Sequence, residues 1–103
     1  MILAAGTECG NELTWPDLKH DLVCGDCIVL VDKMDTKYKT CDSYCSTIVR
    51  KCTGAWEESS DDCTVKSIED CQHNFGYYTS DSICECGEEA GAVHILRQPY
   101  SKI

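Results

Sequence analysis

The chain has 103 residues, of which ten are cysteines, and it carries 18 acidic side chains against 9 basic ones. The length fits one domain, and this cysteine content is typical of a short secreted protein cross-linked by disulfides. The net charge of −9 argues against nucleic acid or an anionic membrane as a partner, because either would need a basic surface. No apolar run approaches the ~20 residues of a membrane-spanning helix, so no membrane span is predicted.

The chain opens with a short apolar segment, Ile2 to Ala5. Residues 1–6 have neither a charged region nor a full apolar core, so they do not form a complete signal peptide. We assign residues 1–8 to an N-terminal tail, 9–86 to a disulfide-cross-linked domain, and 87–103 to a C-terminal linker and strand-like tail.

The even number of cysteines permits five disulfides, with about 945 possible pairings. Two other uses of cysteine compete with this interpretation. Cys24-x-x-Cys27 followed by Cys41-x-x-x-Cys45 resembles a four-thiolate zinc site, and Cys24-x-x-Cys27 alone resembles a redox pair. Zinc would leave six cysteines unexplained, and no thioredoxin-type context surrounds the pair, so disulfides are favoured. The predicted disulfide cysteines are Cys9, Cys24, Cys27, Cys41, Cys45, Cys52, Cys63, Cys71, Cys84 and Cys86.

The spacing of apolar residues predicts a short buried strand followed by an amphipathic helix. Residues 28–31 are apolar and mostly β-branched, which favours the strand. The helix is expected over about residues 35–52, capped by Asp35 or Thr36 and ended by Gly54. Its buried stripe recurs at spacings of three and four residues and comprises Tyr38, Cys41, Cys45, Ile48 and Cys52.

A hairpin is predicted after this helix, with strands at residues 55–57 and 64–66 flanking a polar turn at 59–62. Residues 68–71 are expected to form a helical turn, 72–82 a loop, and 82–86 a strand. Because side chains alternate along a strand, Cys84 and Cys86 should point to the same face and form bridges on the same side of the sheet. The predicted fold is a small disulfide-rich α+β domain, with one amphipathic helix packed on a short antiparallel sheet.

The segments Cys41-Asp-Ser-Tyr-Cys45, Cys52-Thr-Gly-Ala-Trp56 and Cys63-Thr-Val65 resemble the PAN/apple superfamily, and the related WSC-type modules share a similar rhythm of cysteines. The resemblance covers residues 38–66. It implies a helix set against a small antiparallel sheet, with Cys41 paired to Cys63 and Cys45 paired to Cys52. By analogy with apple domains, it also suggests a terminal bridge from Cys9 to Cys84 or Cys86. The implied function is that of a noncatalytic extracellular module that binds protein or carbohydrate.

No catalytic motif is present, and neither an enzyme activity nor a cofactor is predicted. The three histidines, His20, His73 and His94, occupy unrelated contexts. The acidic run at residues 57–62 offers hard oxygen ligands on a turn, which suit calcium, but it has no EF-hand pattern. A solvated acidic turn is the simpler interpretation, so no metal site is predicted.

Several aromatic residues are candidates for contact with a ligand. Trp56 is expected in the core, whereas Trp15, Tyr77 and Tyr78 lie in segments with loop character and are candidate contacts to protein or glycan.

Two apolar segments outside the cysteine-bounded region, residues 2–5 and 92–96, suggest a structural or adhesive role. Each completes the chain's own sheet, or pairs with a neighbouring copy and so builds a filament or matrix. The alternative function is a monomeric secreted binding protein, such as a receptor ligand, toxin, protease inhibitor or lectin-like module. The expected partner is the chain itself, or another extracellular protein or glycan. The residues assigned to assembly are Ile2, Leu3, Val93, Ile95, Leu96 and Tyr100.

Overall fold

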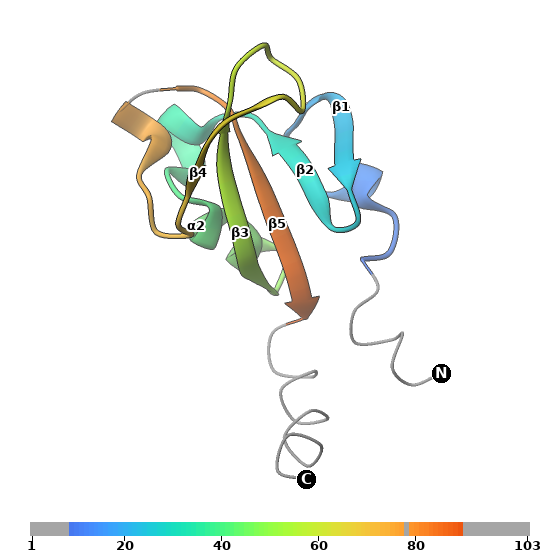
Figure 1. Ribbon diagram of the computed structural model, residues 1–103. Coiled ribbons are helices and arrows are strands. Elements are labelled where there is room, and N and C mark those ends of the chain that lie inside the picture. Colours follow the sequence, from blue (N-terminus) through green and yellow to red (C-terminus); the bar gives the residue numbers. More distant parts are fainter. Residues whose placement is uncertain (1–8, 78, 90–103) are drawn as a thin grey trace, which may run out of the picture.

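The computed structural model describes residues 9–77 and 79–89 (Figure 1). Five strands form one antiparallel sheet in the order β1-β2-β5-β3-β4. This arrangement confirms a small disulfide-rich domain with one α-helix and an antiparallel sheet. The elements are β1 (Leu18–Gly25), β2 (Ile28–Val31), α2 (Cys41–Thr47), β3 (Arg50–Glu58), β4 (Val65–Glu69) and β5 (Ser82–Glu89), with shorter helical turns at Glu12–Thr14, Met34–Tyr38 and Phe75–Tyr77.

The helix is much shorter than the predicted span of residues 35–52. It begins after Thr40, whose side chain accepts a hydrogen bond from the backbone N–H of Ser43, and a separate π-helical turn precedes it. Both ends are set by residues in the left-handed region, with Lys39 at φ 68° and Val49 at φ 57°. Residues 47–49 are three consecutive β-branched residues, which disfavour continuation of a helix. Of the predicted stripe, only Cys41 and Cys45 therefore lie within α2, and Ile48 directly follows its last residue.

Most of the predicted strands are confirmed. β2 occupies the expected residues 28–31, β3 and β4 form the expected hairpin, and β5 contains the predicted residues 82–86. Two predictions are wrong: residues 68–69 lie in β4 rather than in a helical turn, and β5 continues through Gly87 to Glu89 instead of ending in a linker. A further strand, β1, was not predicted.

The main core lies between α2 and one face of the sheet. Cys41, Tyr44 and Cys45 of α2 are fully buried, and they face Val29 on β2 and Cys84 on β5. Turns from elsewhere in the chain close the sides of this core, which adds Met34, Tyr38 and Phe75 to the cluster. Within the described part of the chain, no helix is long and apolar enough to cross a membrane.

Candidate functional site

Five disulfides connect all ten cysteines. The pairings implied by the resemblance, Cys41 with Cys63 and Cys45 with Cys52, are wrong, and Cys9 is not joined to Cys84 or Cys86. Instead, both cysteines of α2 are bonded to β5. The pairs are Cys9–Cys27, Cys24–Cys63, Cys41–Cys84, Cys45–Cys86 and Cys52–Cys71.

A simple match of spacings explains the two bridges between α2 and β5. Four residues of an α-helix rise about 6 Å, and two residues of a strand rise about 6.7 Å. The two cysteines of the helix are therefore separated by nearly the same distance as the two cysteines of the strand, so both pairs can bond. This confirms the expectation that Cys84 and Cys86 form bridges on the same side of the sheet.

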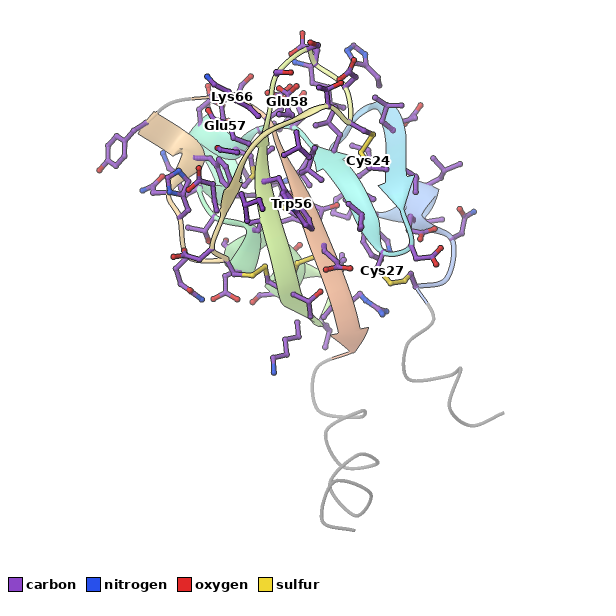
Figure 2. The ribbon with its side chains drawn as sticks, viewed as in Figure 1. Cys24, Cys27, Trp56, Glu57, Glu58 and Lys66 are labelled. Atoms are coloured by element: carbon purple, nitrogen blue, oxygen red, sulfur yellow. A yellow bond between two sulfur atoms is a disulfide. The ribbon has the colours of Figure 1, made fainter. Side chains whose placement is uncertain are left out.

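The opposite face of the sheet carries a row of apolar side chains. Leu30 pairs with Ile83, Ile83 pairs with Trp56, and Trp56 pairs with Ile68 across four strands. Leu30 and Ile83 are buried, Trp56 is partly buried, and Ile68 on the edge strand β4 is 79% exposed. Trp56 thus belongs to a second, smaller apolar layer rather than to the main core (Figure 2).

A loop, residues 59–64, joins β3 to β4 and arches over one end of this face (Figure 1). The disulfide between Cys63 and Cys24 fastens the loop to β1. Lys19 of β1 also reaches it, because the lysine Nζ lies 3.8 Å from Asp61 Oδ1 and 3.3 Å from Asp81 Oδ2.

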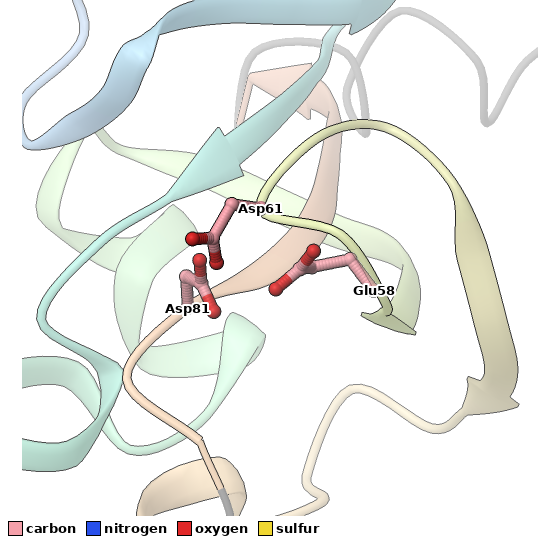
Figure 3. A group of neighbouring side chains, drawn as sticks. All are labelled: Glu58, Asp61 and Asp81. Atoms are coloured by element: carbon pink, nitrogen blue, oxygen red, sulfur yellow. The ribbon is translucent and has the colours of Figure 1, made fainter.

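Three carboxylates meet beneath this loop (Figure 3). Glu58 lies at the end of β3, Asp61 in the loop, and Asp81 immediately before β5. One oxygen from each side chain lies within 4.8 Å of the other two. Glu58 and Asp81 are buried, whereas the Asp61 side chain is 63% exposed and links the cluster to solvent. We refer to Glu58, Asp61 and Asp81 as the carboxylate cluster.

The environment of the cluster displaces the pKa of its two buried members in opposite directions. Burial raises the pKa of Glu58 to about 7, and the neighbouring Asp81 carboxylate acts in the same direction. Burial also opposes ionisation of Asp81. Hydrogen bonds with Glu58 and Thr79, together with the charge of Lys19, outweigh burial and lower its pKa. A proton shared by the pair therefore resides on Glu58.

The predicted ligand contacts do not form one site in the described structure. Tyr77 is 80% exposed and fits the prediction of an accessible aromatic. Trp15 is less accessible than predicted, because it packs against the core and the guanidinium of Arg50 lies 5.7 Å from its ring centroid. Tyr78, His94 and the assembly residues of both tails, Ile2, Leu3, Val93, Ile95, Leu96 and Tyr100, lie outside the described residues.

Two of the three histidines lie in the described part of the chain, and they are far apart in the sequence. His73 lies with Nδ1 3.5 Å from a Glu69 carboxylate oxygen and packs edge-on against the buried ring of Phe75. His20 is exposed on β1 in the left-handed region.

Comparison with protein-family models, with curated proteins and with solved structures finds no match.

The carboxylate cluster was only partly visible in the sequence. The acidic run at residues 57–62 contains Glu58 and Asp61, but Asp81 lies 20 residues beyond Asp61 and is brought in by β5. Asp81 directly precedes the strand that carries Cys84 and Cys86. Its only sequence signal was therefore its position directly before the predicted strand at residues 82–86.

Proposed function

We propose that this chain is a noncatalytic extracellular module with a structural or adhesive role, which associates with copies of itself through its terminal segments. Five disulfides in one small domain favour an oxidising, extracellular environment. The PAN/apple resemblance implies the same class of protein, and it shares with this fold a helix set against a small antiparallel sheet, although its implied disulfide pairs differ.

The free edge of β4 is the observation that carries this proposal. β4 is the outermost strand on its side of the sheet, and its outer edge makes no backbone hydrogen bond to any other described segment. Two of its five residues expose apolar side chains, with Val65 50% and Ile68 79% exposed. An unpaired strand edge with apolar side chains is a template for the addition of another strand.

The opposite edge of the sheet is less suited to strand addition. β1 contains His20 and Asp21 in the left-handed region, and its pairing with β2 has two register shifts. Irregularities of this kind twist an edge strand and interrupt its row of hydrogen-bonding groups. β4 is therefore the receptive edge in this proposal.

The sequence supplies a donor for this edge. Fourteen residues follow Glu89 (103 − 89), and they include the apolar run 92–96. Pairing of this run with β4 of a second copy is a heterologous contact, which can propagate from one molecule to the next. A second donor is the apolar segment 2–5, which precedes the first disulfide.

The test is the native mass of the oxidised protein over a range of concentrations. We expect oligomers from the full chain and monomers from a version ending at Ala90, which retains all of β5. Ile68→Lys should also reduce association by placing a charge at the β4 edge, whereas Val49→Lys should not, although Val49 is also exposed, at 60%. Monomers of the full chain at every concentration would refute self-association.

A monomeric secreted binding protein is the second candidate function, and the exposure of Tyr77 favours it. This ring belongs to the helical turn at Phe75–Tyr77, in which Phe75 is fully buried and Tyr77 is 80% exposed. An exposed aromatic on an anchored turn is a common contact residue in protein interfaces. Loss of partner binding in Tyr77→Ala, with unchanged native mass, would favour this candidate.

A further inference from the structure

We propose that the carboxylate cluster of Glu58, Asp61 and Asp81 is a binding site for a divalent cation of the calcium type. The three side chains come from the end of β3, the following loop and the residue before β5, and Figure 3 shows them converging. One oxygen of each lies within 4.8 Å of the others. A single ion at their centre can therefore contact all three after a small inward movement of the side chains.

A buried oxygen without a hydrogen bond provides the second line of support. The Asp81 side chain is only 3% exposed, and its Oδ1 accepts a hydrogen bond from the Thr79 hydroxyl at 3.0 Å. Its Oδ2 accepts no hydrogen bond from any described residue. The Lys19 ammonium forms an ion pair with this oxygen, with its Nζ 3.3 Å away. A buried carboxylate oxygen that accepts no hydrogen bond is costly in a protein interior, and a cation at the centre of the cluster would contact it.

The charge balance points in the same direction. Once Glu58 has lost its proton, three carboxylates face one ammonium group, that of Lys19, so the cluster has an excess of negative charge in a largely buried space. Burying like charges together is unfavourable unless a counterion accompanies them. A divalent cation would neutralise this excess, and the exposed side chain of Asp61 would give it access from solvent.

The chemistry of the ligands selects the type of ion. All three are carboxylate oxygens, with no imidazole or thiolate among them, which favours a hard cation over zinc or copper. Calcium accepts six to eight oxygens in flexible geometry, whereas magnesium requires a small, nearly ideal octahedron. A site with one solvent-exposed ligand, Asp61, and coordination positions left for water suits calcium. Its affinity should lie in the range of extracellular modules, with a dissociation constant of roughly 0.1–1 mM.

Binding would fasten the β3–β4 loop to the start of β5, next to the disulfide between Cys24 and Cys63. The loop leads directly into β4, the edge strand described above. Calcium would therefore restrict the loop that sets the position of β4.

The experiment is a titration of the isotopically labelled, oxidised full chain with CaCl2, followed by backbone amide resonances at constant ionic strength. We expect saturable shifts at residues 58–62 and 81 with a dissociation constant of roughly 0.1–1 mM, and weaker binding of MgCl2. Asp61→Asn should weaken calcium binding at least about tenfold by removing one ligand charge. This variant should fold, because Asp61 is exposed and asparagine tolerates its φ of 57°.

Two further variants make the result specific to the cluster. Asp35→Asn removes the same charge from an exposed position in a different part of the chain, and it should bind calcium like the wild type. Lys19→Met removes the competing ammonium group and should tighten binding. The proposal is overturned if no saturable shift occurs up to about 20 mM calcium, or if Asp61→Asn and Asp35→Asn behave alike. Either result would leave the proposed extracellular function untouched, because native mass measures that function independently.

Discussion

Asp17 should make a large, pH-dependent contribution to stability. It lies just before β1 and accepts hydrogen bonds from the Tyr38 hydroxyl and from Lys37 Nζ, the latter at 3.0 Å. Lys33 Nζ lies 3.2 Å from its other oxygen. The hydrogen bond from Tyr38, followed by those from the two lysines, lowers the pKa of Asp17 from 3.8 to about 2. Asp17 therefore joins the start of the sheet to the π-helical turn at Met34–Tyr38.

The size of this contribution follows from proton linkage. A pKa lowered from 3.8 to about 2 corresponds to about 2 kcal/mol of stability that depends on the ionised carboxylate. Because the folded-state pKa is the lower one, this stability is present above pH 4 and is lost as the pH falls toward 2. Asp17→Asn keeps the shape of the side chain and tolerates its φ of 51°, but removes the charge.

The assay is urea unfolding of the oxidised protein at pH 7, 4 and 2. Wild type should be more stable than Asp17→Asn by about 1–2 kcal/mol at pH 7, since the side chain is 18% exposed and solvent screens part of the effect. The difference should shrink steadily below pH 4. Asp35→Asn is the control, because the Asp35 side chain forms no hydrogen bond or ion pair among the described residues. A difference that stays constant from pH 7 to pH 2 would refute the claim that the ionised carboxylate of Asp17 stabilises the fold.

Three further predictions concern the face of the sheet opposite α2 and the loop that arches over it. Gly54→Ala should lower the free energy of unfolding by about 1–3 kcal/mol, because a Cβ there would lie 2.6 Å from the Trp56 ring; thermal unfolding measures this, and an unchanged midpoint would contradict it. Replacing Cys24 and Cys63 together by serine should cost about 2–4 kcal/mol in urea unfolding while the other four disulfides keep the fold, and global unfolding would contradict that. Glu58→Gln should be more stable than wild type in urea unfolding with a chelator present, and the difference in the free energy of unfolding should be larger at pH 8 than at pH 5. The raised pKa of Glu58 means that wild-type stability falls as the pH rises from 4.5 to about 7, and parallel pH profiles would contradict this explanation.

The sequence predicted four of the five strands, three of them only in part, because its strongest local signals agree with the tertiary structure. The run 28–31 is apolar on both faces, and in the fold Val29 and Val31 face α2 while Leu30 lies under the other face. The acidic turn between β3 and β4 was equally clear. Local composition and burial point to the same element in both cases.

Prediction failed where a regular pattern was interrupted by backbone geometry. The stripe from Tyr38 to Cys52 is helical in spacing, yet Lys39 and Val49 adopt positive φ and divide it into a turn, a helix and a strand. β1 was missed because His20 and Asp21 adopt the same region, which disrupts the alternation that identifies a strand. Neither interruption has a glycine to mark it.

The disulfide map shows why the pairing of cysteines needs three-dimensional information even when the elements are known. The PAN/apple resemblance implied a bond between Cys45 and Cys52, which are close in the sequence. In the fold, α2 ends at Thr47 and β3 departs along the sheet, so Cys52 pairs with Cys71 and Cys45 is left facing β5. The carboxylate cluster has the same origin, since Asp81 arrives with β5.

The two bridges between α2 and β5 fix more than the position of the helix. Seven residues are too few for a helix to be stable in isolation, and one bridge would leave it free to pivot. Two bridges in step, Cys41–Cys84 and Cys45–Cys86, set its direction, because exchanging the partners would require α2 to run the opposite way along β5. With Cα separations of 5.4 and 5.3 Å, they also hold the helix at nearly constant height above the strand. Because α2 has this fixed direction, Tyr44 points into the core, where its hydroxyl donates to the Pro16 carbonyl at 2.8 Å and joins the helix to the residue before Asp17.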